Sequence, residues 1–275
     1  MNPVQPTMLE QTYTRLNQPR VCCVAGARWE VIEAGCGAPL LLLPGGFGIA
    51  ATSFQYIDAC AGHYRVLAVT YPPQLKRIAA LADGIAALLA VYGIAQAHVV
   101  AGSASGAVAQ VLVRRHPTRV TALILAQTGL PERRRAALAR TLAQVCQVLP
   151  SGIMLALMRL AILRFLPYSD ELHAFWRSHF AEVVSTQNRA ALAARWHALA
   201  DYDRNYCFRP SDLQHWPGRV ALIEASNDGM LSPKARAKLR ACYPQAQIYT
   251  LAEAGHASSV TNPAPQIALI REFLG

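Results

Sequence analysis

The chain has 275 residues, of which 53% are hydrophobic and 15% are charged, and its formal net charge is +10. This composition provides apolar side chains for one large domain with a buried core and excludes a largely disordered chain. The positive charge is consistent with an anionic partner, but no aromatic residues alternate with the arginines as in a base-stacking surface, so we expect no nucleic-acid partner.

The chain shows no sign of membrane insertion or secretion. Residues 1–20 contain no apolar run of signal-peptide length, and the longest apolar segment, at 151–166, is interrupted by Arg159 and Arg164. A spanning helix needs about 20 apolar residues, so we expect no transmembrane segment. The seven cysteines are scattered, without C-x-x-C spacing. This pattern favours reduced thiols in a cytoplasmic protein over a zinc site or a disulfide framework.

Short apolar runs alternate with helical patterns along most of the chain. The predicted strands lie at 28–35, 39–45, 64–72, 97–103, 120–127, 219–228 and 246–254. The first is expected to be antiparallel, and the others have the character of strands buried on both faces of a parallel sheet. Periodicity and capping residues predict helices at 76–93, 232–244 and 262–274. The alternation predicts an α/β fold with a mostly parallel central sheet flanked by helices.

The alternation of strands and helices stops between residues 131 and 217. Four helical stretches fill this block, at about 131–149, 151–166, 169–185 and 186–203. We interpret the block as an all-helical cap inserted over the carboxyl ends of the strands, where open α/β sheets bind ligands. The predicted organisation is an N-terminal extension at 1–27, a core at 28–130 and 217–275, and a cap at 131–216.

The segment HVVAGSASGAVAQ, at 98–110, ends an apolar run in a cluster of very small residues. A nucleophile elbow is a sharp strand-to-helix turn, and the residues two before and two after its nucleophile must be small. Both Ser103 and Ser105 meet this demand. The apolar run ends at Ala101 and Gly102, which puts the turn at Ser103, whereas Ser105 would extend the strand through poor strand formers. We therefore predict that Ser103 is the nucleophile.

The same segment resembles the nucleophile elbow of the α/β-hydrolase superfamily, in which an apolar strand precedes G-H-S-M-G-G-A-V-A. The resemblance extends to ALIEASNDGMLSP, where Asp228 takes the place of the acid, and to LAEAGHASSVTNP, where His256 takes the place of the base. This superfamily places serine, acid and histidine in that chain order. The resemblance implies that His256 takes the proton of Ser103 while Asp228 orients and stabilises the imidazole.

The turn LLLLPGGFG, after the first long strand, resembles the H-G-x turn that supplies an oxyanion-hole donor in this superfamily. The resemblance implies backbone amides of Gly46 and Ala104 as the two donors. Pro44 stands where the superfamily usually has histidine. A second departure is TYPPQLKRIAAL, at 70–81, which lacks the common D-x-x-G-x-G-x-S and is similar to the maspardin-like branch, several of whose members lack a complete triad.

Together these motifs predict a serine hydrolase that cleaves an ester or thioester of an apolar acyl substrate through an acyl-enzyme, with no cofactor and no metal. Ser103 argues against the dehalogenases and epoxide hydrolases of this fold, which have aspartate as the nucleophile. Two alternatives stay open, because a fold does not settle a reaction. One is a non-hydrolytic acyltransferase, C–C lyase or cyclase of secondary metabolism on the same scaffold, and the other is a catalytically silent binding protein.

The cap offers candidate substrate contacts. Met154 and Met158 are four residues apart on one face of a predicted helix, and thioethers adapt to varied apolar ligands. Packing of this face on the core is the alternative interpretation. With Phe47 of the glycine-rich turn, these methionines form the predicted substrate pocket. Arg133–Arg135 are expected to meet the phosphate of a CoA-bound or carrier-protein-bound thioester, or an acidic carrier protein.

Overall fold

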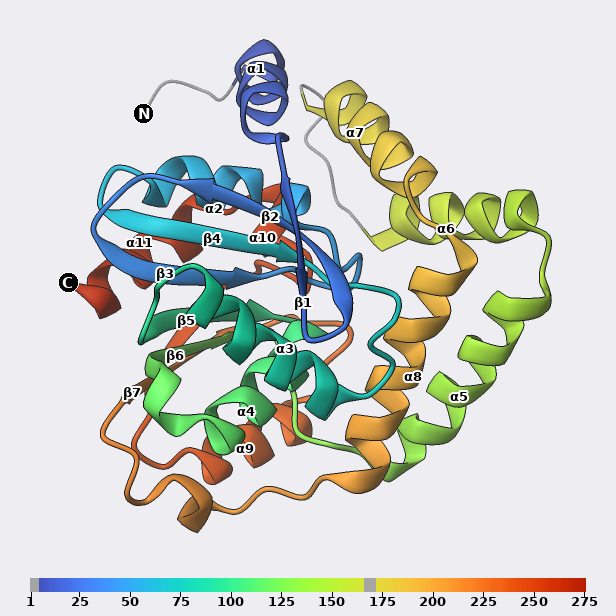
Figure 1. The fold of residues 1–275 in the computed structure, drawn as a ribbon. Coiled ribbons are helices and arrows are strands. Elements are labelled where there is room, and N and C mark those ends of the chain that lie inside the picture. The colour runs from blue at the N-terminus through green and yellow to red at the C-terminus, as the bar shows by residue number, and fades with distance from the viewer. Residues whose placement is uncertain (1–4, 166–171) are drawn as a thin grey trace.

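The structure is a computed structural model that describes residues 5–165 and 172–275. An eight-stranded sheet lies at its centre, in the order β1-β2-β4-β3-β5-β6-β7-β8 (Figure 1). The strands are β1 (Arg20–Val24), β2 (Ala27–Ala34), β3 (Ala38–Leu43), β4 (Tyr64–Thr70), β5 (Ala97–Gly102), β6 (Val120–Ala126), β7 (Arg219–Ala225) and β8 (Gln247–Leu251). The β1–β2 and β2–β4 pairs are antiparallel, and the other neighbouring pairs are parallel.

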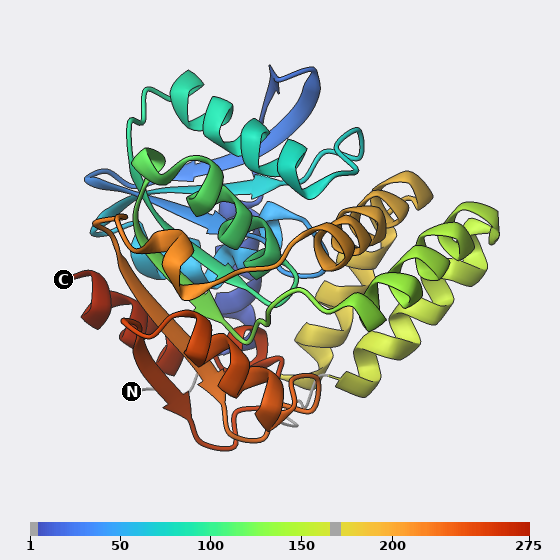
Figure 2. The same cartoon turned by 90° about the horizontal axis from the view of Figure 1, so that it is seen from below.

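Helices cover both faces of this sheet. The core helices are α1 (Pro6–Leu16), α2 (Phe54–Cys60), α3 (Ile78–Val91), α4 (Ser105–Arg115), α9 (Pro233–Cys242), α10 (Ser258–Thr261) and α11 (Ala264–Leu274), with 3-10 turns η1 (Ala50–Ser53), η2 (Pro117–Arg119) and η3 (Pro210–Leu213). Residues of α3, α4 and α9 share one buried cluster with the sheet, and α3 packs beside α4 (Figure 2). Residues of α1, α2 and α11 share the cluster on the other face.

The apolar runs of the central strands are explained by burial on both faces. In β3, Leu41 and Leu43 belong to the cluster beneath α3 and α4, whereas Leu40 and Leu42 belong to the cluster beneath α2 and α11. All four leucines are at most 4% exposed. Alternate side chains of a strand point to opposite faces, so a strand that is covered on both sides needs apolar residues at every position.

The sheet begins earlier in the chain than predicted. Residues 1–27 were expected to be an extension outside the core, but β1 lies within them and pairs with β2 from Arg20↔Val31 to Val24↔Ala27. Ala25 and Gly26, which join the two strands, have φ angles of 52° and 72°, as a tight hairpin turn requires. Most of β1 is exposed or half-buried, so this strand lacks the burial on both faces that marks the central strands.

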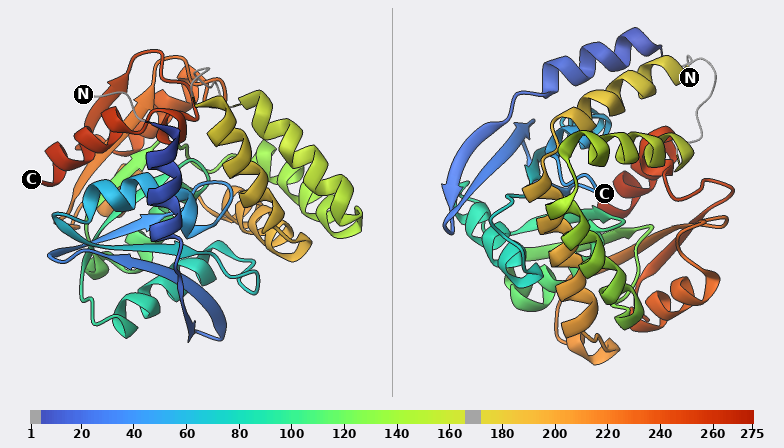
Figure 3. Two further views of the ribbon diagram at one scale, coloured as in Figure 1. Left: turned by 90° about the horizontal axis from the view of Figure 1, so that it is seen from above. Right: turned by 90° about the vertical axis from the view of Figure 1, so that its right-hand side faces the viewer.

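Four helices follow β6 and precede β7 in the described part of the chain: α5 (Arg133–Val148), α6 (Ser151–Phe165), α7 (His173–Ser185) and α8 (Arg189–Asn205). They form the expected helical block, which stands to one side of the sheet (Figure 3). α5 packs along α8, α6 packs on α7, and α7 also contacts α1. Among the residues described, no helix has both the length and the apolar character to cross a membrane.

Candidate active site

Ser103 occupies the sharp turn between β5 and α4. Its φ angle is 51°, in the left-handed region that residues other than glycine rarely adopt. The turn is fixed from both sides by the end of β6, because the Ser103 amide donates to the Ala126 carbonyl at 2.9 Å and the Thr128 hydroxyl donates to the Ser103 carbonyl at 2.7 Å. The surrounding structure thus holds Ser103 in a strained conformation, as an elbow requires.

The small residues around Ser103 have different roles. A Cβ atom on Gly106 would lie 2.2–2.5 Å from atoms of the Thr128 side chain, so any larger residue there would force this side chain to shift. Ser105 is fully buried and accepts a hydrogen bond from the Tyr71 hydroxyl at 3.0 Å. Ser103, in contrast, lines a cavity. Of the two serines that the sequence offered, Ser103 is therefore the one accessible to a ligand.

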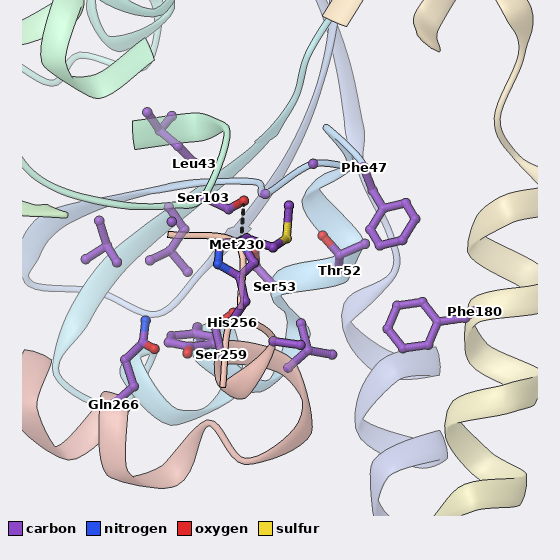
Figure 4. Close-up of a pocket in the computed structure, with 18 of the residues that line it drawn as sticks. Leu43, Phe47, Thr52, Ser53, Ser103, Phe180, Met230, His256, Ser259 and Gln266 are labelled. Carbon is purple, nitrogen blue, oxygen red and sulfur yellow. Dashed lines mark hydrogen bonds between the residues drawn. The ribbon is translucent and has the colours of Figure 1, made fainter. Parts of the chain in front are cut away.

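The structure brings Ser103, His256 and Asp228 together. Ser103 Oγ lies 2.9 Å from His256 Nε2 (Figure 4), and His256 Nδ1 lies 3.0 Å and 2.9 Å from the two carboxylate oxygens of Asp228. Ser103 follows β5, Asp228 follows β7 and His256 follows β8. These strands are parallel, so their carboxyl ends meet at one edge of the sheet and place the three side chains in one row.

Hydrogen bonds between two loops fix the distance from the acid to the base. The Gly255 amide donates to the Asn227 side chain at 2.7 Å, and the Glu253 amide donates to the Ser226 hydroxyl at 3.0 Å. Gly255 has a φ angle of 71°, which glycine adopts without a steric penalty. The residues before Asp228 therefore hold the loop that carries the histidine.

Asp228 is held in its ionised form. Burial alone raises the pKa of its carboxyl group, but the hydrogen bond and charge of His256 and the amides of Met230 and Leu231 outweigh burial and lower the pKa below its ordinary value. These two amides donate to Asp228 Oδ1 at 2.8 Å and 2.9 Å. The Asp228 side chain is fully buried and that of His256 is 18% exposed, so a carboxylate faces the imidazole away from water.

The two amides expected in the oxyanion hole lie beside Ser103. Gly46 lines the same cavity as Ser103, and both Gly46 and Ala104 line a smaller hollow of about 40 Å³ next to it. Ala104 precedes α4, and the first amides of a helix have no acceptor within it. Neither amide donates to another residue in the part of the chain that the structure describes. Both are therefore free to donate to a bound oxygen atom.

The cavity beside Ser103 has a volume of about 300 Å³ and is mostly apolar. Phe47 lines it, as expected, and stacks obliquely on Phe180 of α7 with ring centroids 5.7 Å apart. The described residues that line the cavity include none with an acidic side chain and neither lysine nor arginine. They are Leu42, Leu43, Gly45, Gly46, Phe47, Thr52, Ser53, Tyr56, Val100, Gly102, Ser103, Ala161, His179, Phe180, Met230, His256, Ala257, Ser259, Val260 and Gln266.

Met154 and Met158, which were expected in the pocket, lie elsewhere. Met154 is 4% exposed and belongs to a cluster within the cap, and Met158 packs against that cluster. The i, i+4 spacing therefore marks a face of α6 that packs on other cap helices, and neither the predicted pocket nor the alternative of packing on the core describes it. The methionine in the wall of the cavity is Met230, which follows Asp228 in a loop and carries no periodic signal.

Comparison of the sequence with protein-family models and with curated proteins gave no match. The fold, however, is similar to those of solved enzymes. A hydrolase from Pseudomonas aeruginosa PA01 has a TM-score of 0.80 and 20% identity, with 94% of this chain and 99% of that one covered. A thermophilic esterase from Thermogutta terrifontis has a TM-score of 0.78 and 18% identity, with 94% and 98% covered.

A third protein of similar structure is described as an α/β hydrolase. It is an α/β-hydrolase enzyme from a deep-sea metagenome library, with a TM-score of 0.76 and 17% identity, covering 93% of this chain and 97% of that one. This chain therefore has the α/β-hydrolase fold, with a mostly parallel sheet flanked by helices. Identities this low establish the fold alone, so the chemistry must be argued from the residues of the site.

Proposed function

We propose that this protein is a serine hydrolase that cleaves an ester or a thioester of an apolar acyl substrate. The observation that carries the proposal is the 2.9 Å contact between Ser103 Oγ and His256 Nε2 in the wall of a mostly apolar cavity. A serine hydroxyl is a weak nucleophile at neutral pH, and a hydrogen-bonded base activates it. The buried Asp228 carboxylate behind His256 supports the same role.

The proposed reaction passes through an acyl-enzyme. His256 Nε2 takes the proton as Ser103 Oγ attacks the carbonyl carbon, and the carbonyl oxygen becomes an oxyanion to which Gly46 and Ala104 donate. His256 then protonates the departing alcohol or thiol, which leaves the acyl group on Ser103. A water molecule, deprotonated by His256, attacks this ester, and the acid is released. Asp228 stays ionised and stabilises the imidazolium in both steps.

Reaction with a fluorophosphonate probe, followed by intact-mass measurement, tests the proposal. The wild type should gain one adduct, Ser103→Ala should gain none, and His256→Ala should react much more slowly because it lacks the base. Ser259→Ala is the matched control, because Ser259 lines the same cavity and has no part in the proposed reaction. Ser105→Ala tests the buried serine and should retain the adduct.

The outcomes separate this proposal from its rivals. An adduct that persists in Ser103→Ala contradicts the assignment of the nucleophile. An unlabelled but folded wild type favours a binding protein without catalysis. If Ser103 is acylated and passes the acyl group to an added alcohol in preference to water, the protein is an acyltransferase on the same scaffold.

A basic groove on the cap supports a thioester carried by CoA or by an acidic carrier protein. Arg135 is engaged by Asp203 through two hydrogen bonds of 2.6 Å, so it is not free for a phosphate. Arg133, Arg140 and Arg204 line the groove between α5 and α8. We propose this groove as the phosphate contact. Arg133→Glu together with Arg140→Glu should raise the KM for a CoA thioester severalfold and leave the KM for a neutral ester unchanged.

A further inference from the structure

Three residues that line the catalytic cavity each have a polar side-chain atom that is buried without a hydrogen-bond partner in the described protein. These atoms are the Tyr56 hydroxyl, Gln266 Oε1 and His179 Nδ1. The three residues are 8%, 2% and 4% exposed. Buried polar atoms are normally paired, because an unpaired one has lost its hydrogen bonds to water. Because these residues border the cavity that Ser103 lines, a ligand with a polar group is a natural source of the missing partners.

Tyr56 and Gln266 define where one polar group would bind. Tyr56 lies on α2 and Gln266 on α11, and these two helices pack against each other. The two side chains do not hydrogen-bond to each other in the structure. A tyrosine hydroxyl donates and accepts, whereas an amide oxygen only accepts. A ligand hydroxyl can accept a hydrogen bond from the Tyr56 hydroxyl and donate one to Gln266 Oε1 at the same time. If the amide of Gln266 is turned the other way, the ligand hydroxyl accepts from its NH2 group and donates to Tyr56.

The polar group is expected to be uncharged. The described lining holds no arginine, lysine or acidic residue. Burial lowers the pKa of His179 to about 4 and raises that of Tyr56 far above its ordinary value, so both are neutral near pH 7. A carboxylate or phosphate placed here would be buried without a counter-charge, which is strongly unfavourable. An alcohol or phenol hydroxyl carries no such cost.

The position of Gln266 assigns this group to the acyl part of the substrate. Gln266 and Phe180 lie on opposite sides of the Ser103–His256 pair (Figure 4). Gln266 is 2% exposed, whereas Met230, on the side of the pair away from Gln266 (Figure 4), is 62% exposed. The acyl group stays on the enzyme while the leaving group must depart, so the buried end suits the acyl group and the exposed side suits the leaving group.

We propose that Tyr56 and Gln266 bind a hydroxyl group on the acyl chain, which makes the substrate a hydroxyacyl ester or thioester. This inference rests on the proposed function and names its substrate class. The cavity of about 300 Å³ has room for about ten non-hydrogen atoms if each occupies roughly the 30 Å³ of a water molecule. Sequence patterns mark neither residue, because α2 and α11 meet only in the folded chain.

Binding to the Ser103→Ala protein tests this proposal without any turnover. The probes are methyl esters of ω-hydroxy acids of increasing length, each paired with the ester that has a methyl group in place of the hydroxyl, and calorimetry gives Kd. At one length the hydroxylated ester should bind at least about tenfold more tightly. Tyr56→Phe and Gln266→Leu, made separately on this background, should each remove that preference without weakening the methyl-terminated ester.

The control variant is Tyr249→Phe, because Tyr249 lies on β8 and does not line the cavity. It should retain the preference. If Tyr56→Phe weakens the binding of both esters of a pair equally, Tyr56 has a purely structural role and the proposal is overturned. Equal affinities for the two esters at every chain length also overturn it. Failure of the proposed function is recognised separately, by the absence of a fluorophosphonate adduct on Ser103 in the wild type.

Discussion

The sheet and the cap of this protein are stabilised in different ways. Central strands such as β3 are covered on both faces, and the four leucines of β3 are at most 4% exposed. In the cap, in contrast, large apolar residues remain exposed on α5 and α6, namely Leu138, Val145, Val148, Ile153, Leu157 and Leu160. Two-sided packing holds the loops of the triad rigidly, whereas the cap relies on one-sided packing and on a few polar contacts. The core therefore positions the chemistry, and the cap shapes access to it.

The largest effect is expected from a change in the core that leaves packing intact. Asp228→Asn preserves the shape of the side chain and can still accept from the amides of Met230 and Leu231, but it removes the charge that orients His256. We expect kcat to fall by about 10⁴-fold, with little change in the melting temperature. Steady-state kinetics with an activated ester measures this, and a loss of less than tenfold would contradict the role of Asp228.

A second change tests the polar contacts of the cap. The side chain of Asp203 is fully buried, and its partner Arg135 is 33% exposed. Arg135→Met leaves a buried carboxylate without its counter-charge, which should lower the free energy of unfolding by about 3–5 kcal/mol. The control is Arg134→Met, since Arg134 is exposed and should change stability little. Urea titration compares the two variants, and equal stabilities would show that the pair contributes nothing.

The contact between cap and core should be sensitive to acid. His179 on α7 packs against Tyr13 of α1 and Phe54 of α2, and burial lowers its pKa from 6.5 to about 4. Between these two values the unfolded chain binds a proton that the folded chain does not, so stability falls as pH falls. The loss should reach about 3 kcal/mol near pH 4.

The variant His179→Phe isolates this contribution. It should lose less stability than the wild type between pH 6.5 and pH 4, because it has no proton to bind at this site. Denaturation at a series of pH values measures the difference. Parallel pH profiles of the two proteins would show that His179 does not titrate as expected.

The smallest effects are expected from a glycine-to-alanine substitution made once in the core and once in the cap. Gly106→Ala, in the core helix α4, brings a methyl group against Thr128 and should cost about 1–3 kcal/mol of stability. Gly152→Ala, in the cap helix α6, meets no atom within 4 Å and should raise stability by about 0.5 kcal/mol through helix propensity. Thermal unfolding distinguishes these opposite signs, and a gain for Gly106→Ala would mean that the elbow is looser than the structure indicates.

The sequence predicted the strands that are buried on both faces and the helices between them, because continuous apolar runs and 3.6-residue periodicity are local signals. It missed β1, whose residues are largely exposed. It also missed α1, although this helix is amphipathic, and α2, which has only seven residues. For the site, the motifs predicted Ser103, Asp228 and His256, and the structure places these side chains within hydrogen-bonding distance. Their catalytic roles stay predictions until the labelling experiment is done.

The sequence by itself determined the order of the elements and the turn at Ser103, because each depends on neighbouring residues. Only the tertiary structure decided what surrounds the substrate. Tyr56, His179 and Gln266 come from helices far apart in the chain and meet in one cavity, whereas Met154 packs within the cap. A local pattern shows which face of a helix is apolar, but the element that covers this face depends on how the whole chain packs.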